Sequence, residues 1–263
     1  MSELDSLLDG KSRAVPERVL DEEGARRRHL VVSLTGAHAF GFPSADGDLD
    51  LSAVHVDRTE ALLGLAPPVA HATRFEVIDG VEIDYTSNEI QLVVVGLLNG
   101  NGSYLERVVG RLPLRETPAL AELRALARGA LSRRYHRHYR GFAAGMLREL
   151  ESAERATAKK ILYVLRTALT GAHLLASGEV VTDVTQLLDE HGFGDAHALV
   201  ARKRAAERLP VDDDERRAWI ARLGRALELV DEAEARSPLP DEPPYRAAVE
   251  AWLLALRRAD LSG

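Results

Sequence analysis

Apolar residues follow different patterns in the two halves of the chain. Up to about residue 115 they form short runs between turn residues, which is typical of strands and short helices. The segments 29–34 (HLVVSL) and 49–56 (LDLSAVHV) each predict a buried strand. Asp79-Gly80 favours a tight hairpin between strands at 71–78 and 81–85. The first 15 residues predict a loose arm, and helices are predicted over 16–27, 59–63, 88–98 and 103–107.

From Pro118 onward, apolar positions recur at helical spacing almost without interruption. Helices are predicted over 119–128, 132–153, 157–176, 184–190, 196–207, 213–236 and 244–258. We therefore expect an α+β first half followed by an all-α second half. The domain boundary is placed near residue 115, so that the domains are 1–115 and 116–263.

Composition narrows the class of protein. The net charge of −7 argues against a nucleic-acid footprint over the whole surface, although a local basic patch is compatible with it. The chain has no cysteine, which excludes disulfides, thiolate nucleophiles and cysteine-ligated metal centres. It has no apolar run near the length of about 18 residues that a membrane span needs, and its amino terminus is polar and acidic. We therefore expect a cytoplasmic protein without membrane association.

Candidate chemistry lies in the segment 34–51 (LTGAHAFGFPSADGDLDL), where a glycine turn leads to two aspartates at the start of a strand. Alternation along a strand sends the carboxylates of Asp48 and Asp50 to the same face. Neighbouring carboxylates repel each other, and a divalent cation with oxygen ligands, such as Mg²⁺, relieves that repulsion. Glu82 and Asp84 share one face of the hairpin's second arm, so this strand offers a further acid.

Three interpretations of these acids compete. A solvated acidic turn is the ordinary one, but it leaves Asp50 unexplained within an apolar strand. A calcium loop beginning at Asp46 requires glycine and glutamate where Leu51 and Asp57 stand. In the third interpretation, the acids hold one or two Mg²⁺ ions while Gly36 and its neighbours present backbone N–H groups to phosphates. That interpretation predicts a metal-dependent nucleotide site.

The stretches 36–41 (GAHAFG) and 46–51 (DGDLDL) resemble the signature of the DNA polymerase β nucleotidyltransferase superfamily. In that signature, glycine and serine precede a short loop and then a D-x-D pair. The similarity is closest to the RlaP family of predicted nucleotidyltransferases, where the two stretches read like GSHAYG and DSDIDL. It extends through 99–101 (NGN) and 105–106 (LE) into the helical half, and so covers most of the chain.

The resemblance implies a polymerase-β-like mixed sheet with helices, followed by a helical domain that binds nucleotide or substrate. It implies that Asp48 and Asp50 are catalytic metal ligands and that a third acid on a nearby strand completes the set. We choose Asp84 for that acid and keep Glu82 in reserve. The implied reaction transfers a nucleoside monophosphate, AMP from ATP, to a hydroxyl acceptor with Mg²⁺ or Mn²⁺. An RNA end is one candidate acceptor, and small molecules and protein side chains serve as acceptors elsewhere in the superfamily.

Two residues depart from the family pattern, because Ala37 and Gly47 stand where the family has serine. In the superfamily the first of these serines helps to hold the phosphates, so its loss removes one hydrogen bond, about 1 kcal/mol. Backbone donors at Gly36 and Ala37 remain for the nucleotide. An alternative is therefore a catalytically impaired, nucleotide-binding regulatory protein. A third hypothesis is an antitoxin-like protein that binds or nucleotidylates a partner.

The predicted helix 157–176 has an apolar face and an opposite face that carries Lys159, Tyr163, Arg166, Thr170 and His173. A solvated stripe is the usual explanation of such a face. The RlaP-like pattern is similar, however, with a lysine, then a histidine or aromatic residue, then an arginine. The resemblance implies that Lys159 and Arg166 contact phosphate and that Tyr163 contacts base or ribose. The histidines of the chain show no HExxH or other zinc-binding spacing.

Overall fold

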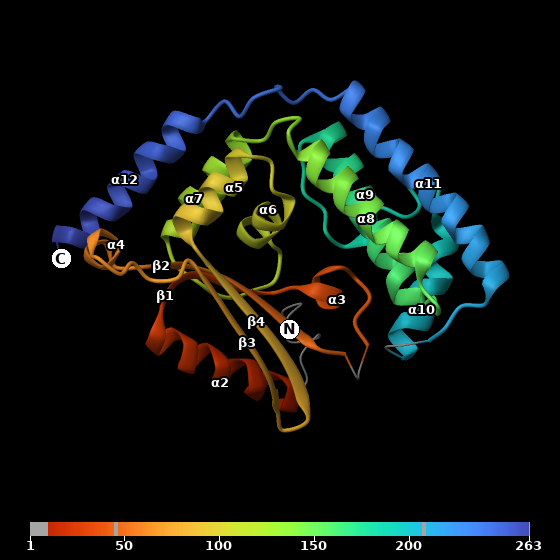
Figure 1. Cartoon of the computed structure of the whole chain (residues 1–263), viewed down its shortest axis with the longest axis horizontal. Coiled ribbons are helices and arrows are strands. Elements are labelled where there is room, and N and C mark those ends of the chain that lie inside the picture. The colour runs from red at the N-terminus through yellow and green to blue at the C-terminus, as the bar shows by residue number, and fades with distance from the viewer. Residues whose placement is uncertain (1–9, 45–46, 207–208, 263) are drawn as a thin grey trace.

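The computed structural model describes residues 10–44, 47–206 and 209–262, and the described residues form a mixed five-stranded sheet with helices around it (Figure 1). The strand order is β3-β4-β2-β1-β5, in which β2 and β4 are parallel and the other neighbours are antiparallel. The strands are β1 (Arg28–Leu34), β2 (Leu49–Val56), β3 (His71–Ile78), β4 (Val81–Glu89) and β5 (Pro113–Glu116). The expected α+β class with a mixed sheet is confirmed.

Helices cover both faces of the sheet because apolar side chains alternate along its central strands. Val32 and Leu51 pack on one face with residues of α2 (Gly10–Arg26), such as Val19. Val31 and Val54 pack on the other face, which is covered by α5 (Ile90–Leu98), α6 (Gly102–Val109) and α7 (Ala119–Gly129). Figure 1 shows α2 below the sheet and the other three helices above it.

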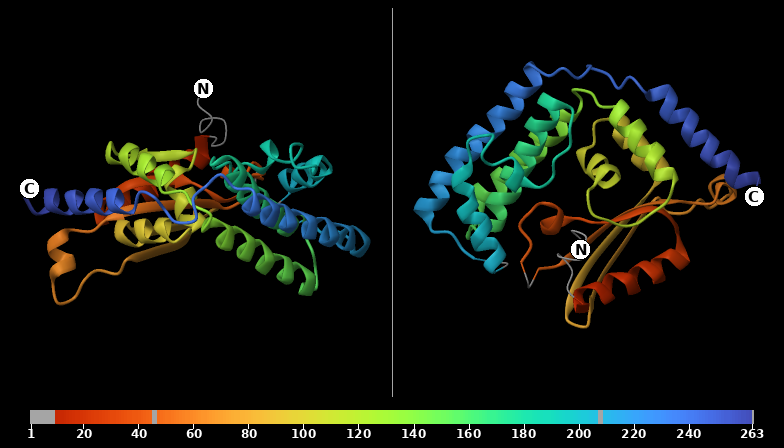
Figure 2. Two further views of the ribbon diagram at one scale, coloured as in Figure 1. Left: turned by 90° about the horizontal axis from the view of Figure 1, so that it is seen from above. Right: turned by 180° about the vertical axis from the view of Figure 1, so that it is seen from behind.

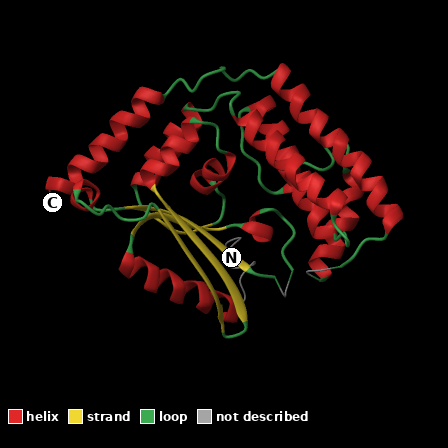
Figure 3. Cartoon of the chain, viewed as in Figure 1, coloured by secondary structure: helices red, strands yellow, loops and turns green. Residues whose placement is uncertain are grey.

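The helical half is built around α9 (Ala158–Ser177), which lies between α8 (Tyr135–Ser152), α10 (His197–Ala205) and α11 (Asp213–Ala235) (Figure 3). Thr157 begins α9 because its side chain accepts a hydrogen bond from the Lys160 backbone, and Gly178 ends it with a φ of +78°. Phe40 and Phe42 belong to the same hydrophobic cluster as α9 and the sheet. A continuous core therefore joins the sheet to the helical half.

The helix α12 (Arg246–Ser262) returns from the helical half to the sheet half and lies beside α4 (Thr59–Leu63) (Figure 2). Its Asp260 carboxylate accepts a hydrogen bond of 2.6 Å from the Thr59 backbone, and Arg257 forms an ion pair of 2.5 Å with Glu89. The predicted boundary near residue 115 marks a change in sequence pattern. The hydrophobic packing crosses it, because α7 and α12 pack against elements of residues 1–115. The boundary stays a prediction. No helix in the described part of the chain is long and apolar enough to cross a membrane.

Some elements differ from the sequence prediction. The prediction of a loose arm was wrong for residues 10–15, because α2 begins at Gly10 and contains Pro16. The packing of Val15 and Val19 in the core outweighs the cost of a proline inside the helix. Residues 1–9 lie outside the described residues. The strand β5 and the short helix α3 (Gly36–Ala39) were not predicted. The helix predicted over 184–190 is a 3-10 turn, η1 (Val184–Gln186), followed by further turns.

Candidate active site

Two of the predicted acids stand opposite each other on neighbouring strands. Asp50 of β2 and Asp84 of β4 are direct partners in the parallel register. Their sequence neighbours, such as Leu51 and Ile83, are buried on the opposite face, so alternation turns both carboxylates to the same side of the sheet. Both acids line one cavity of about 290 Å³.

The cavity is lined by residues of the sheet, α3, α6 and α9, so it lies where the two halves of the chain meet. Its lining includes Thr35, Gly36, Phe40, Asp50, Ser52, Asp84, Thr86, Ser103, Glu106, Arg107, Tyr163, Arg166 and Thr182. The structure thus brings together five of the residues that the sequence singled out: Gly36, Asp50, Asp84, Tyr163 and Arg166. The arrangement combines acids on one wall with cations on the others.

The glycine turn is packed directly against Asp50. Gly36 has a φ of +57°, and a Cβ atom at this position would lie 1.6 Å from the Asp50 Oδ2 atom. The preceding Thr35 donates from its backbone to the Asp50 carbonyl at 2.8 Å, and its hydroxyl lies 3.1 Å from the same oxygen. The Thr35 hydroxyl also contacts the Ser52 hydroxyl at 3.2 Å. Only glycine fits the turn, and the turn fixes the strand that carries the acid.

The α9 wall presents an arginine in a fixed orientation. Arg166 is buried, and its Nη1 atom lies 2.7 Å from Glu106 Oε1, which also accepts a hydrogen bond of 3.0 Å from the Tyr139 hydroxyl. The guanidinium carbon of Arg166 is 3.6 Å from the centroid of the Phe40 ring. Tyr163 packs edge-on against the same ring at a centroid distance of 5.7 Å. Ion pairing and stacking therefore limit how far Arg166 and Tyr163 can move.

Sequence reasoning missed a second cavity arginine. Arg107 of α6 donates to the Ala53 carbonyl at 3.1 Å, to the Asn88 side chain at 2.5 Å and to the Thr86 hydroxyl at 3.2 Å. Burial lowers the pKa of Arg107, but an arginine remains charged at any physiological pH. Within the described residues, the Nε atoms of Arg107 and Arg166 are buried and have no hydrogen-bond partner. Both arginines line the cavity, so each places a positive charge beside it.

Other predicted site residues lie away from the cavity lining. Asp48 is half-buried immediately before β2, and Ala37 is buried in α3 behind Gly36. Lys159 lies further toward the start of α9, with its Nζ atom 5.9 Å from the centroid of the Tyr163 ring. Glu82 lies on β4 outside the lining. Asp46 falls outside the described residues.

The donor set fits a divalent cation with hard oxygen ligands, because the Asp50 and Asp84 carboxylates share a face and a cavity. In the described part of the chain, Asp48, Asp50 and Asp84 do not bring three carboxylate oxygens within 4.8 Å of one another. A metal site with three carboxylates therefore requires a side chain to rotate. Asp48, immediately before β2, is the one of the three acids that does not line the cavity. The set can hold a metal–phosphate group between the acids and the arginines.

Comparisons with known proteins show which family the chain resembles over most of its length. A model of the RlaP family, described as the RNA repair pathway DNA polymerase beta family, matches residues 17–255. An uncharacterized protein of Methanocaldococcus jannaschii is 22% identical over 224 residues, which cover 84% of this chain and 91% of that protein. The crystal structure of a nucleotidyltransferase-like protein from Exiguobacterium sibiricum aligns over 92% of this chain and 78% of that chain, with 13% identity and a TM-score of 0.34.

Proposed function

Because the chain belongs to the RlaP family, the RNA repair pathway DNA polymerase beta family, over residues 17–255, we propose that it is a metal-dependent nucleotidyltransferase. The transferred group is a nucleoside monophosphate, AMP from ATP, and the acceptor is a hydroxyl group. The observation that carries the proposal is the pairing of Asp50 with Asp84 across β2 and β4, in one cavity with Arg166.

In this proposal, Asp50 and Asp84 hold Mg²⁺ or Mn²⁺, and Asp48 joins them by rotating toward the cavity. The bound ion supplies charge neutralisation at the phosphate that is attacked. Arg166 orients the triphosphate through a guanidinium already fixed by Glu106, and Lys159 reaches the same phosphates from the preceding turns of α9. Tyr163 contacts the base or the ribose.

The reaction is an in-line displacement. The acceptor oxygen attacks the α-phosphorus, a new oxygen–phosphorus bond forms, and the bond to the pyrophosphate leaving group breaks. Asp84, which is exposed at the cavity, takes the proton of the acceptor hydroxyl. Arg107 supports this geometry by bonding Thr86 and Asn88, the residues that follow Asp84 on β4. An RNA end is the proposed acceptor, supported by the description of the family.

The regulatory alternative rests on the missing serines at Ala37 and Gly47. Ala37 is 8% exposed, packs in the core and does not line the cavity, whereas Gly36, Ala39 and Phe40 of the same segment do. The loss of that hydroxyl therefore leaves the acids and the arginines of the cavity intact. This supports an active enzyme over a protein that only binds nucleotide.

The test is to incubate the full chain with Mg²⁺ and each triphosphate labelled at the α-phosphate, alone and with RNA. We expect pyrophosphate release and transfer of the label, and loss of both in Asp50→Asn. Glu60→Gln is the control, because Glu60 is an exposed acid on α4 that contacts only Arg58 among the ion pairs described. Stoichiometric triphosphate binding without pyrophosphate release would refute the enzyme and favour the regulatory alternative.

A further inference from the structure

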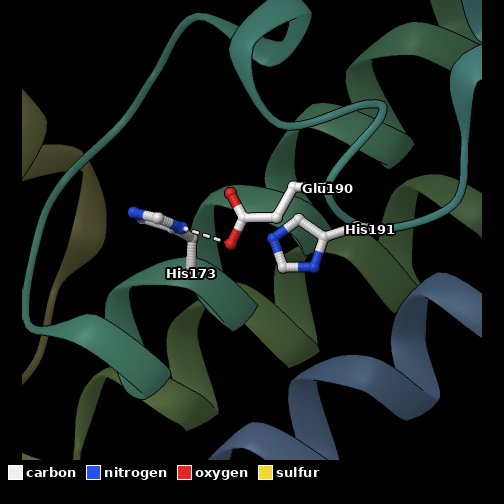
Figure 4. A group of neighbouring side chains, drawn as sticks. All are labelled: His173, Glu190 and His191. Carbon is white, nitrogen blue, oxygen red and sulfur yellow. Dashed lines mark ion pairs between the residues drawn. The ribbon is translucent and has the colours of Figure 1, made fainter.

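A second cluster of potential metal ligands lies beyond the cavity, near the end of α9. Among the described residues, His173, Glu190 and His191 each offer one donor atom, and these atoms lie within 4.8 Å of one another. Figure 4 shows the imidazole of His173 on the helix and the side chains of Glu190 and His191 on the following turn, gathered around one point. His173 Nδ1 lies 3.8 Å from Glu190 Oε1, and the two histidine rings are nearly perpendicular at a centroid distance of 6.2 Å.

The local sequence fixes the turn that carries two of these residues. Gly192 has a φ of +78°, and Phe193 donates from its backbone to the Leu188 carbonyl at 2.7 Å. This is the hydrogen-bond pattern of a Schellman cap, in which glycine closes the last helical turn. Because Phe193 is buried, the cap is anchored in the core, and Glu190 and His191 are held opposite α9.

The exposure of the three side chains suits metal binding. His173 is 16% exposed, whereas Glu190 is 59% exposed and free to adjust its carboxylate. The Nε2 atom of His191 is buried and has no hydrogen-bond partner among the described residues. A buried, unsatisfied nitrogen is unfavourable unless another group, such as a metal ion, takes its lone pair.

The chemistry of the set separates it from the acids of the cavity. Two imidazoles and one carboxylate are a frequent ligand set of Zn²⁺, and they leave a fourth position for water. Mg²⁺ prefers oxygen ligands and near-octahedral geometry, so it suits the aspartates and not this cluster. His173 also lies seven residues after Arg166, which is about 10 Å along a helix. The cluster is therefore distinct from the nucleotide cavity.

We propose that His173, Glu190 and His191 bind one Zn²⁺ ion, with water as the fourth ligand. Zinc–ligand bonds of about 2.0–2.2 Å place tetrahedral ligands roughly 3.3–3.6 Å apart. The donor atoms lie within 4.8 Å of one another, and His173 Nδ1 is 3.8 Å from Glu190 Oε1, so small side-chain movements bring them to that spacing. Because Glu190 is exposed, its carboxylate can rotate toward the ion. The ion ties the end of α9 to the turn that leads into α10, and so stabilises the helix that carries Arg166.

The test uses the full chain, freed of metal with a chelator and then titrated with zinc chloride in a calorimeter. We expect one equivalent of Zn²⁺ to bind to the wild type and to Asp50→Asn, whose cluster is intact. His173→Gln and His191→Gln should bind Zn²⁺ more than about 100-fold more weakly, since even the loss of an outer-shell partner costs 10–100-fold. His197→Gln is the matched control, because His197 is nearby and exposed but pairs with Asp189 outside the cluster.

Two results would overturn the proposal. One is a wild type that binds no Zn²⁺, and the other is Zn²⁺ binding that is lost in Asp50→Asn but kept in His191→Gln, which would assign the ion to the aspartates. Co²⁺ added to the wild type gives a second readout that does not depend on the folding of any variant. A four-coordinate site intensifies its visible absorption, whereas an unchanged hydrated spectrum counts against the site. Neither measurement uses nucleotide, so failure here leaves the proposed nucleotidyl transfer intact.

Discussion

Replacing Gly36 with alanine perturbs the candidate active site where the glycine turn contacts the Asp50 carboxylate. The added Cβ would lie 1.6 Å from Asp50 Oδ2, and an ordinary contact begins at 3.4 Å. The Asp50 carboxylate must therefore move by about 1.8 Å, because the backbone of the turn is held by Thr35. Gly80→Ala is a matched control, because Gly80 also has a positive φ, +82°, but a Cβ there would meet nothing within 4 Å.

The control separates backbone strain from displacement of the acid. A left-handed conformation costs a residue with a side chain about 1–2 kcal/mol, so Gly80→Ala should lower the free energy of unfolding by that amount. Gly36→Ala should lower it by about 2–5 kcal/mol, because overpacking adds roughly 1–3 kcal/mol. A displacement of this size at a reacting group costs about 100-fold in rate or more.

The assay combines urea unfolding with Mg²⁺-dependent pyrophosphate release and with Mn²⁺ binding measured by electron paramagnetic resonance. We expect Gly36→Ala to lose both turnover and Mn²⁺ binding under conditions where it remains folded, and Gly80→Ala to keep both. A folded Gly36→Ala that binds Mn²⁺ like the wild type would refute the reasoning that Asp50 holds the ion beside the glycine turn.

Three further predictions follow from the site and the sheet. Asp84→Asn should abolish pyrophosphate release while Glu82→Gln retains it, which a release assay on both variants checks; the opposite result would make Glu82 the third acid. Arg107→Met should lower the free energy of unfolding in urea by about 2–4 kcal/mol, because three acceptors on β2 and β4 lose their donor. Burial lowers the pKa of both His29 and His55 to about 4, so the unfolded chain binds more protons than the folded chain between pH 6.5 and 4. The stabilisation from the two neutral histidines should be fully present above pH 6.5, and the free energy of unfolding should fall as pH drops toward 4, by at most about 3 kcal/mol per histidine. The difference between the urea midpoints at pH 7.5 and 4.5 should be smaller in His55→Gln than in the wild type.

Local sequence signals predicted much of the fold. The strand 49–56 and the first hairpin strand 71–78 have the predicted bounds, because apolar alternation and the Asp79-Gly80 turn act over only a few residues. The family and the mixed-sheet fold are also confirmed. The strand β5 was missed because its four residues (PLRE) have no apolar alternation and pair only with β1. Its existence depends on a partner distant in sequence.

Some residues of the candidate sites could be predicted from local sequence, and others are brought together only by the fold. Asp50 and Gly36 were found from one short motif, whereas the choice of Asp84 depended on the resemblance, and the roles of all these residues stay predictions. Arg107 gave no signal, because its acceptors on β2 and β4 lie between 19 and 54 residues away. His173 and Glu190 belong to different elements and meet only through the turn closed by Gly192. The spacing of residues in the sequence predicts contacts within one helix or strand. The contacts of Arg107 and of the His173 cluster form between elements, so the spacing does not reveal them.

The return of α12 to the sheet half has a consequence for folding. The hydrogen bonds between α12 and Thr59 join residues that are 198 and 201 positions apart, and the ion pair between Arg257 and Glu89 spans 168 positions. Loops of this length close slowly relative to local contacts. During synthesis, α4 and the start of α5 therefore cannot pack against α12 until almost the whole helical half has been made. Until then their apolar surface is open to chaperones or to aggregation, which makes assembly of this chain sensitive to conditions that leave the native state unaffected.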